Sequence, residues 1–143
     1  MKQALIQADK AFKSEEIPVG AVVIKEDKVI GRAYNQREQL NDPTAHAEIL
    51  AIRSACHNLK TQNLSNCTIF VTLEPCSMCA SAIQNSRIKR LYFGCNDEQR
   101  GAINSGTKIF SQKNCNHKPE IYDGIIEVKS VAREPGSLSL IHI

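Results

Sequence analysis

The sequence has no long apolar run and no large excess of charge of either sign. Its first ten residues include Lys2, Asp9 and Lys10, so we expect neither a signal peptide nor a membrane-spanning segment. The formal net charge is only +3, which is compatible with a nucleic-acid partner but does not require one. Internal repeats and linkers are also absent, and 143 residues predict a single domain with one core.

Six cysteines occur in a chain for which we expect no secretory signal. This combination indicates a reducing compartment, and hence a cytoplasmic protein, in which thiolates bind metal instead of forming disulfides. Cys76 and Cys79 form a Cys-x-x-Cys motif. The other four cysteines have no such spacing, and we interpret them as small buried apolar side chains.

The spacing of apolar residues predicts helices that alternate with strands. The expected elements are a helix over 2–14, a hairpin of strands 19–24 and 29–34, a buried helix after residue 42, a strand over 69–73, a helix over about 76–85, and strands over 90–94 and 120–122. We expect the helix after residue 42 to begin with Asp42 as its cap and Pro43 at its first position. The alternation predicts an α/β sheet that is at least partly parallel. Residues 95–119 form a long polar loop, of the kind that usually carries function.

The end of the chain departs from this pattern. Residues 124–132 begin like an amphipathic helix, which Pro135 and Gly136 then break. The last six residues, 138–143, correspond to the translation of CTGTCTCTTATACACATC, the end of a common sequencing adapter. We therefore interpret 1–133 as the domain and 134–143 as an atypical tail, a truncation or adapter artefact that replaces the end of the helix. A natural edge strand is the alternative, because short apolar runs are ambiguous.

Two short motifs carry the chemistry of the chain. Thr44 to Glu48 contains His46, and Pro75 to Cys79 contains the two cysteines of the Cys-x-x-Cys. His46, Cys76 and Cys79 are zinc-ligand types, and three of them leave one position of a tetrahedral ion open. Glu48 is not needed as a ligand. An open metal site beside a spare carboxylate is typical of a hydrolytic catalyst.

Two alternatives to this interpretation stay open. The metal site could be a closed structural one, with Cys67, Cys95, Cys115 or His57 as the fourth ligand. Glu48 could be a solvated helix carboxylate, although unpaired glutamate is rare at the start of a buried helix.

The two motifs match a known pattern of zinc-dependent base deaminases. The chain resembles the bacterial-type tRNA-specific adenosine deaminases of the cytidine-deaminase-like superfamily, over about residues 1–124. The resemblance lies in the segments 17–22, 42–49, 72–80, 86–88, 93–94 and 101–102, and in Asn35, Asp97, Asn116 and His117.

This resemblance implies a three-layer α/β/α fold, with a mixed sheet of about five strands and helices on both faces. It implies one Zn²⁺ per subunit, bound by His46, Cys76 and Cys79, and a homodimer that acts on the anticodon loop of tRNA. The reaction that the resemblance implies is hydrolytic deamination of adenosine to inosine at the wobble position, with arginine tRNA as the expected substrate. Glu48 would move a proton from the attacking water to a ring nitrogen and then to the departing ammonia.

The resemblance also implies substrate contacts. Asn35 is similar to an asparagine that binds the flipped base, and Asp97 to a residue beside the target ribose, where a 2′-hydroxyl contact favours RNA. Further contacts are implied for pocket-wall residues Glu16, Val19, Gly20 and Ala21 and for the anticodon-loop residues Asn116 and His117. From the residues alone, Asn35 could instead be a turn residue, Asp97 a loop cap, and Val19 and Ala21 plain core.

Basic side chains offer a further hypothesis. Six of them could contact tRNA phosphates or form a solvated face: Arg87, Lys89, Arg90, Lys108, Lys113 and Lys118. Two other functions stay open as alternatives. One is a small-molecule base or nucleoside deaminase of the guanine or cytidine type, and the other is a non-catalytic zinc protein that binds RNA.

Overall fold

The computed structural model describes residues 1–124, so the predicted C-terminal helix and the tail lie outside the described residues. The elements follow the order α1 (Lys2–Lys13), β1 (Gly20–Lys25), β2 (Lys28–Tyr34), α2 (Ala47–Leu59), β3 (Thr68–Leu73), α3 (Ser77–Asn85), β4 (Arg90–Cys95), the 3₁₀ turn η1 (Ile109–Ser111) and β5 (Glu120–Tyr122). The hairpin and the later strands lie within a residue or two of the predicted positions. None of the helices in residues 1–124 has the length and apolar character needed to cross a membrane.

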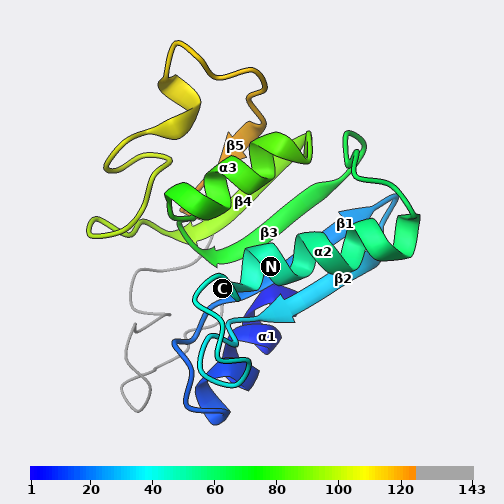
Figure 1. Ribbon diagram of the computed structural model, residues 1–143, viewed down its shortest axis with the longest axis vertical. Helices are drawn as coiled ribbons and strands as arrows, with labels where there is room; N and C mark the ends of the chain where they lie inside the picture. Colours follow the sequence, from blue (N-terminus) through cyan, green and yellow to red (C-terminus); the bar gives the residue numbers. More distant parts are fainter. Residues whose placement is uncertain (125–143) are drawn as a thin grey trace.

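One mixed sheet of five strands, in the order β2-β1-β3-β4-β5, forms the centre of the molecule (Figure 1). β1 runs antiparallel to both of its neighbours, whereas β3, β4 and β5 are mutually parallel. The α3 helix connects β3 to β4, as parallel pairing requires. Leu73 and Cys95 are paired at the carboxyl ends of β3 and β4, so the loops that follow these two strands start side by side at the same end of the sheet. Ligand sites in open α/β sheets lie at this end of the strands.

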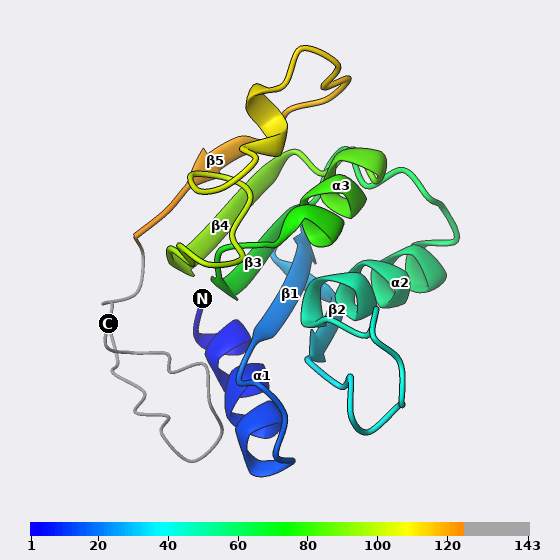
Figure 2. The ribbon, with the colours of Figure 1, turned by 60° about the vertical axis from the view of Figure 1, so that its left-hand side comes forward.

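Helices cover both faces of the sheet (Figure 2). On one face, Ala21, Val23, Val71 and Phe93 pack with the buried side of α2 and α3 in the main core. On the other face α1 crosses β1 so closely that a Cβ on Gly20 would overlap the carbonyl oxygen of Ala4. The predicted three-layer arrangement is therefore confirmed for the described residues.

The predicted start of α2 is wrong. Asp42 does cap, but it caps a turn, because its Oδ1 accepts the backbone N–H of Thr44 at 2.8 Å and the Thr44 hydroxyl at 2.7 Å. The chain then stays extended at His46, with φ −74° and ψ 152°, and the helix begins at Ala47. His46 is thus the N-cap residue of α2 instead of a member of its first turn. Asp, Pro and Thr favour such turns as much as helix starts, so composition alone did not separate the two.

Candidate active site

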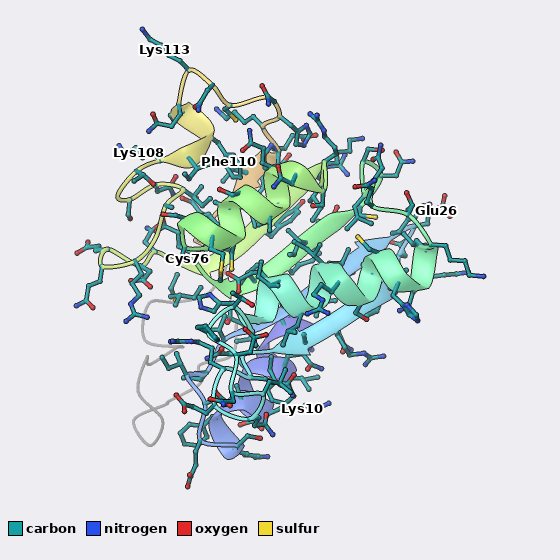
Figure 3. All side chains as sticks on the ribbon, viewed as in Figure 1. Lys10, Glu26, Cys76, Lys108, Phe110 and Lys113 are labelled. Carbon is teal, nitrogen blue, oxygen red and sulfur yellow. The ribbon has the colours of Figure 1, made fainter. Side chains whose placement is uncertain are left out.

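The first turns of α2 and α3 meet beside the edge at which β3 ends. His46 is the N-cap residue of α2, and Cys76 is the N-cap residue of α3. Figure 3 shows Cys76 between the first turns of these two helices. Cys79 lies one turn further along α3 and is fully buried. Both helices therefore direct their partially positive N-terminal ends at this point, which favours anionic sulfur there.

The three predicted ligands have the spacing of a tetrahedral zinc site. His46 Nδ1 lies 3.6 Å from Cys76 Sγ and 3.5 Å from Cys79 Sγ. Zinc bonds of about 2.0–2.1 Å to nitrogen and about 2.3 Å to sulfur place such atoms about 3.6 Å apart at the tetrahedral angle. Within residues 1–124 no fourth histidine, cysteine or acidic residue joins this group. A closed site with Cys67, Cys95, Cys115 or His57 is therefore not formed by the described chain.

The environments of the two cysteine sulfurs shift their pKa values in opposite directions. Hydrogen bonds donated by Cys79 and by His46 lower the pKa of Cys76 to about 4. The hydrogen bond between the two cysteines and burial raise the pKa of Cys79 well above its usual range. The hydrogen bond to Cys76 raises the pKa of His46. The site thus favours the thiolate form of Cys76, and a bound dication would displace the proton of Cys79.

Glu48 lies next to this group and is only 4% exposed. Burial raises the pKa of its carboxyl to about 7, and the side chain is hydrogen-bonded to Cys79. A cation held by the three ligands would favour the ionised form of Glu48. A carboxyl group with a pKa near neutrality, placed beside a metal position without being a ligand, is suited to take up and release a proton.

A pocket opens over the metal position. Its walls are formed by Ile17, Val19, Asn35, Arg37, His46, Ala47, Glu48, Leu73, Glu74, Cys76, Asp97 and Arg100. Asn35 is 5% exposed, and its Nδ2 donates to the backbone oxygen of Ile17 at 3.3 Å. Its Oδ1 is buried and has no hydrogen-bond partner in the structure. A buried acceptor without a protein partner is costly, so this oxygen is available to accept a hydrogen bond from a molecule that enters the pocket.

The structure brings Asn35, Val19 and Asp97 to this pocket but not the other predicted wall residues. Glu16 is not among the lining residues; its buried carboxylate accepts the backbone N–H groups of Glu38 at 3.1 Å and Gln39 at 2.7 Å. Gly20 and Ala21 are fully enclosed by α1 and by the main core, respectively.

Asn116 and His117 lie elsewhere. His117 hydrogen-bonds the backbone oxygen of Ile88 at 2.8 Å and lines a second, shallower hollow with Arg87, Lys89 and Lys118. This hollow is at the edge where β4 and β5 begin, roughly 16 Å along β4 from the metal position. Lys108 and Lys113 project from the outer part of the 96–119 loop (Figure 3). Arg90 lies 3.6 Å from Glu120 in an exposed ion pair.

Three charged pocket residues were not predicted as site residues from the sequence: Arg37, Glu74 and Arg100. Arg37 and Arg100 occur in loops without periodic structure, and only the fold brings them together. Glu74 had a local signal, since it is an ionisable residue between an apolar strand and the Cys-x-x-Cys motif.

Comparison with known proteins places the chain in a family. The profile of the MafB19-like deaminases matches residues 1–130. A tRNA-specific adenosine deaminase from Rickettsia bellii is 49% identical over 127 residues, which cover 87% of this chain and 88% of the relative. One from Agrobacterium fabrum is 47% identical over 130 residues, covering 91% and 86% of the two chains. The chain belongs to the tRNA-specific adenosine deaminases.

Solved structures agree with this assignment. A structure from studies of A-to-I editing by tRNA:A34 deaminases matches the deaminase with a TM-score of 0.85 and 48% identity, over 87% of this chain and 95% of the other. A guanine deaminase from Bacillus subtilis matches with a TM-score of 0.64 and 36% identity, over 66% of this chain and 61% of the other. The fold is thus cytidine-deaminase-like, and the match to the tRNA deaminase extends further along the chain.

Proposed function

We propose that the deaminase converts adenosine to inosine at the wobble position of tRNA, with one zinc ion per subunit. The observation that carries the proposal is the buried, unpaired Oδ1 of Asn35 in the same pocket as His46, Cys76 and Glu48. It provides an acceptor for a base beside a metal position and a carboxyl that can move protons. The similarity to tRNA-specific adenosine deaminases supports adenosine in RNA as the source of that base.

The reaction adds water to C6 of adenine and releases ammonia, so the C6–N6 bond breaks while a C6–O bond forms. Zinc held by His46, Cys76 and Cys79 would supply the nucleophile by lowering the pKa of a water molecule. Glu48 takes the proton that this water loses and delivers it to ring nitrogen N1. It then takes the remaining proton from the oxygen that has added to C6 and gives it to the leaving amine, so that one carboxyl serves as base and as acid.

The other walls of the pocket have separate tasks in this proposal. Asn35 orients the base, because its Oδ1, which has no protein partner, accepts a hydrogen bond from the base. Asp97 lies beside the ribose, and the guanidinium groups of Arg37 and Arg100 would attract phosphates near the entrance. Because a base must leave its stack to enter such a pocket, an unpaired anticodon loop is a less costly substrate than a duplex.

Three finer statements belong to the same proposal. We propose arginine tRNA as the substrate, the cytoplasm as the location and a homodimer as the active form, all from the resemblance to the bacterial-type enzymes. The basic residues Arg87, Lys89 and Lys118 would contact RNA phosphates outside the pocket, together with Asn116 and His117.

An anticodon stem-loop assay tests the reaction and the substrate together. We expect inosine to form in an arginine-tRNA stem-loop with adenosine at the wobble position, and no turnover of free adenosine, cytidine or guanine at equal concentration. Product nucleosides would be quantified after digestion. If guanine is deaminated and the stem-loop is not, the chain is a small-molecule deaminase and the proposal is wrong. Binding of the stem-loop without turnover of any of these substrates would instead identify an RNA-binding zinc protein.

Replacing Asn35 by alanine should weaken catalysis strongly while the metal stays bound. The change removes the acceptor that the base would pair with, and a lost hydrogen bond of about 1–3 kcal/mol corresponds to roughly 5- to 150-fold in kcat/KM. Asn58→Ala is the matched control, because the exposed Asn58 amide also donates to a backbone oxygen, that of Ile30, but far from the pocket. We expect Asn58→Ala to keep full activity. Equal activity of the two variants would contradict the role of Asn35.

A further inference from the structure

Glu74 is a buried carboxylate on which a whole loop converges. It is 3% exposed. Its Oε1 accepts the backbone N–H of Asp97 and the hydroxyl of Ser105, both at 3.0 Å. Its Oε2 accepts the backbone N–H groups of Ile103 and Asn104 at 2.9 Å and of Ser105 at 3.0 Å. The two oxygens thus receive five hydrogen bonds from one segment, residues 97–105.

The same segment is joined to the cysteine motif that follows Glu74. The backbone N–H of Ala102 donates to the oxygen of Pro75 at 2.9 Å, and Gly101 forms a bridge with Cys76. A Cβ on Gly101 would collide with the carboxyl carbon of Glu74 and lie 2.5 Å from the oxygen of Asp97. Gly101 therefore packs against Glu74 with no room for a side chain.

This segment has no regular secondary structure to hold its shape, since it lies between the end of β4 at Cys95 and η1 at Ile109. It nevertheless supplies Asp97 and Arg100 to the pocket, and Glu74 itself lines the same pocket. The Oδ1 of Asp97 accepts the N–H groups of Gln99 and Arg100, both at 3.1 Å, which closes the turn that places Arg100. The position of this wall thus depends on a carboxylate that directly precedes the metal-binding motif.

We propose that Glu74 is a positioning residue for the RNA substrate, which holds residues 97–105 as the ribose-side wall of the pocket and fixes that wall to the Cys76 segment. The inference rests on the proposed function, because it takes the ribose of an RNA substrate to lie beside Asp97. Glu74 itself takes no part in the chemical step. Its loss should therefore weaken substrate binding more than turnover.

Glu74→Gln is the sharpest test because it keeps the volume and removes one acceptor. An amide has one accepting oxygen, so its nitrogen must face some of the five donors. The arrangement that keeps most of these hydrogen bonds places the amide oxygen where Oε2 now accepts the N–H groups of Ile103, Asn104 and Ser105. The amide nitrogen then takes the place of Oε1, and the Ser105 hydroxyl can rotate to accept a hydrogen bond from it. The N–H of Asp97 then faces a donor, so Asp97 is the part of the wall that the variant releases.

For Glu74→Gln we expect KM for the stem-loop to rise about tenfold or more, kcat to change less, and zinc to remain at one per chain. We also expect the variant to lose preference for a ribose over a 2′-deoxyribose at the target nucleotide, measured as the ratio of the two kcat/KM values. A variant that merely loosened the fold would lower activity on both sugars alike. Unchanged KM and an unchanged ribose preference would overturn the proposal, as would loss of zinc, since Glu74 would then hold the metal site and not the substrate wall.

Ser105→Ala provides a milder variant in case Glu74→Gln does not fold. It removes one of the five hydrogen bonds and should raise KM by a few-fold in the same direction. Ser111→Ala, an exposed serine in η1, is its matched control and should behave as the parent enzyme. If Ser105→Ala equals Ser111→Ala in KM and in ribose preference, the proposal fails. Failure of the unmodified enzyme to edit the stem-loop would instead refute the proposed function, so the two failures are distinguishable.

Discussion

Glu48→Gln is expected to lower kcat by about 10²-fold or more while the protein keeps one zinc per chain. The magnitude is the usual scale for the loss of an acid–base group that acts in the transition state. The amide has the same shape as the carboxyl and preserves the packing at the start of α2, where Glu48 is 4% exposed. It cannot take up the proton of the attacking water, so the reaction should stall at the first transfer.

The environment of Glu48 explains why no neighbouring group should replace it. Burial raises the pKa of this carboxyl to about 7, whereas Cys76 and Cys79 would both be committed to the metal. Of the two other carboxylates on the pocket wall, Glu74 is occupied by five hydrogen bonds and Asp97 by the N–H groups of its own turn. The residual activity of the variant should therefore come from positioning and the metal alone.

The measurement is single-turnover inosine formation in a saturating concentration of enzyme, together with the zinc content of the same sample. Glu26→Gln is the control, since this exposed glutamate lies in the β1–β2 turn, away from Cys76 (Figure 3). It removes the same charge and should leave the rate unchanged. Activity of Glu48→Gln within threefold of the parent would show that another group moves the proton, and the mechanism would be wrong.

Much of the fold was predictable because its elements are specified locally. Strands β1 to β4 are apolar runs between charged turns or helices, and their spacing already indicated a hairpin followed by parallel pairing. The start of α2 was not predictable in this way. Asp42 uses one side-chain oxygen to bind the Thr44 N–H in a turn, and the same residue types cap helices. Only the structure shows that residues 42–44 form a turn and that the helix begins after His46.

In the candidate site, too, the residues in short local motifs were predictable, whereas those positioned by distant parts of the chain were not. His46, Glu48, Cys76 and Cys79 occur in two short motifs, so their chemistry is recognisable from spacing alone. Glu74 receives its hydrogen bonds from residues 23 to 31 positions further along the chain, and nothing near it in sequence indicates them. Glu16 is a similar case. The resemblance implied a place in the pocket wall, and the structure shows a role that the sequence did not indicate, because its carboxylate binds the backbone N–H groups of Glu38 and Gln39.

Cys79→Ala is expected to abolish zinc binding and activity together, and to remove the stabilisation that zinc gives. Cys79 is fully buried, and its sulfur lies 3.5 Å from His46 Nδ1. Without it two ligands remain, which hold a tetrahedral ion poorly. Zinc at a hundred times its dissociation constant stabilises the folded protein by about 2.7 kcal/mol, or roughly 5–11 °C in Tm for a chain of this size. Addition of zinc should raise the Tm of the metal-stripped parent by that amount and leave that of Cys79→Ala unchanged.

Cys67→Ala separates loss of a ligand from loss of a buried sulfur. Cys67 is 1% exposed and packs in the main core, but it is not part of the metal-binding group of the described residues. Both variants remove one buried sulfur atom and should lose similar packing stability in the metal-free state. Only Cys67→Ala should then regain stability and inosine formation when zinc is added back. If zinc raises the Tm of both variants equally, the ion binds somewhere other than His46, Cys76 and Cys79, and the assignment of the metal site would have to be abandoned.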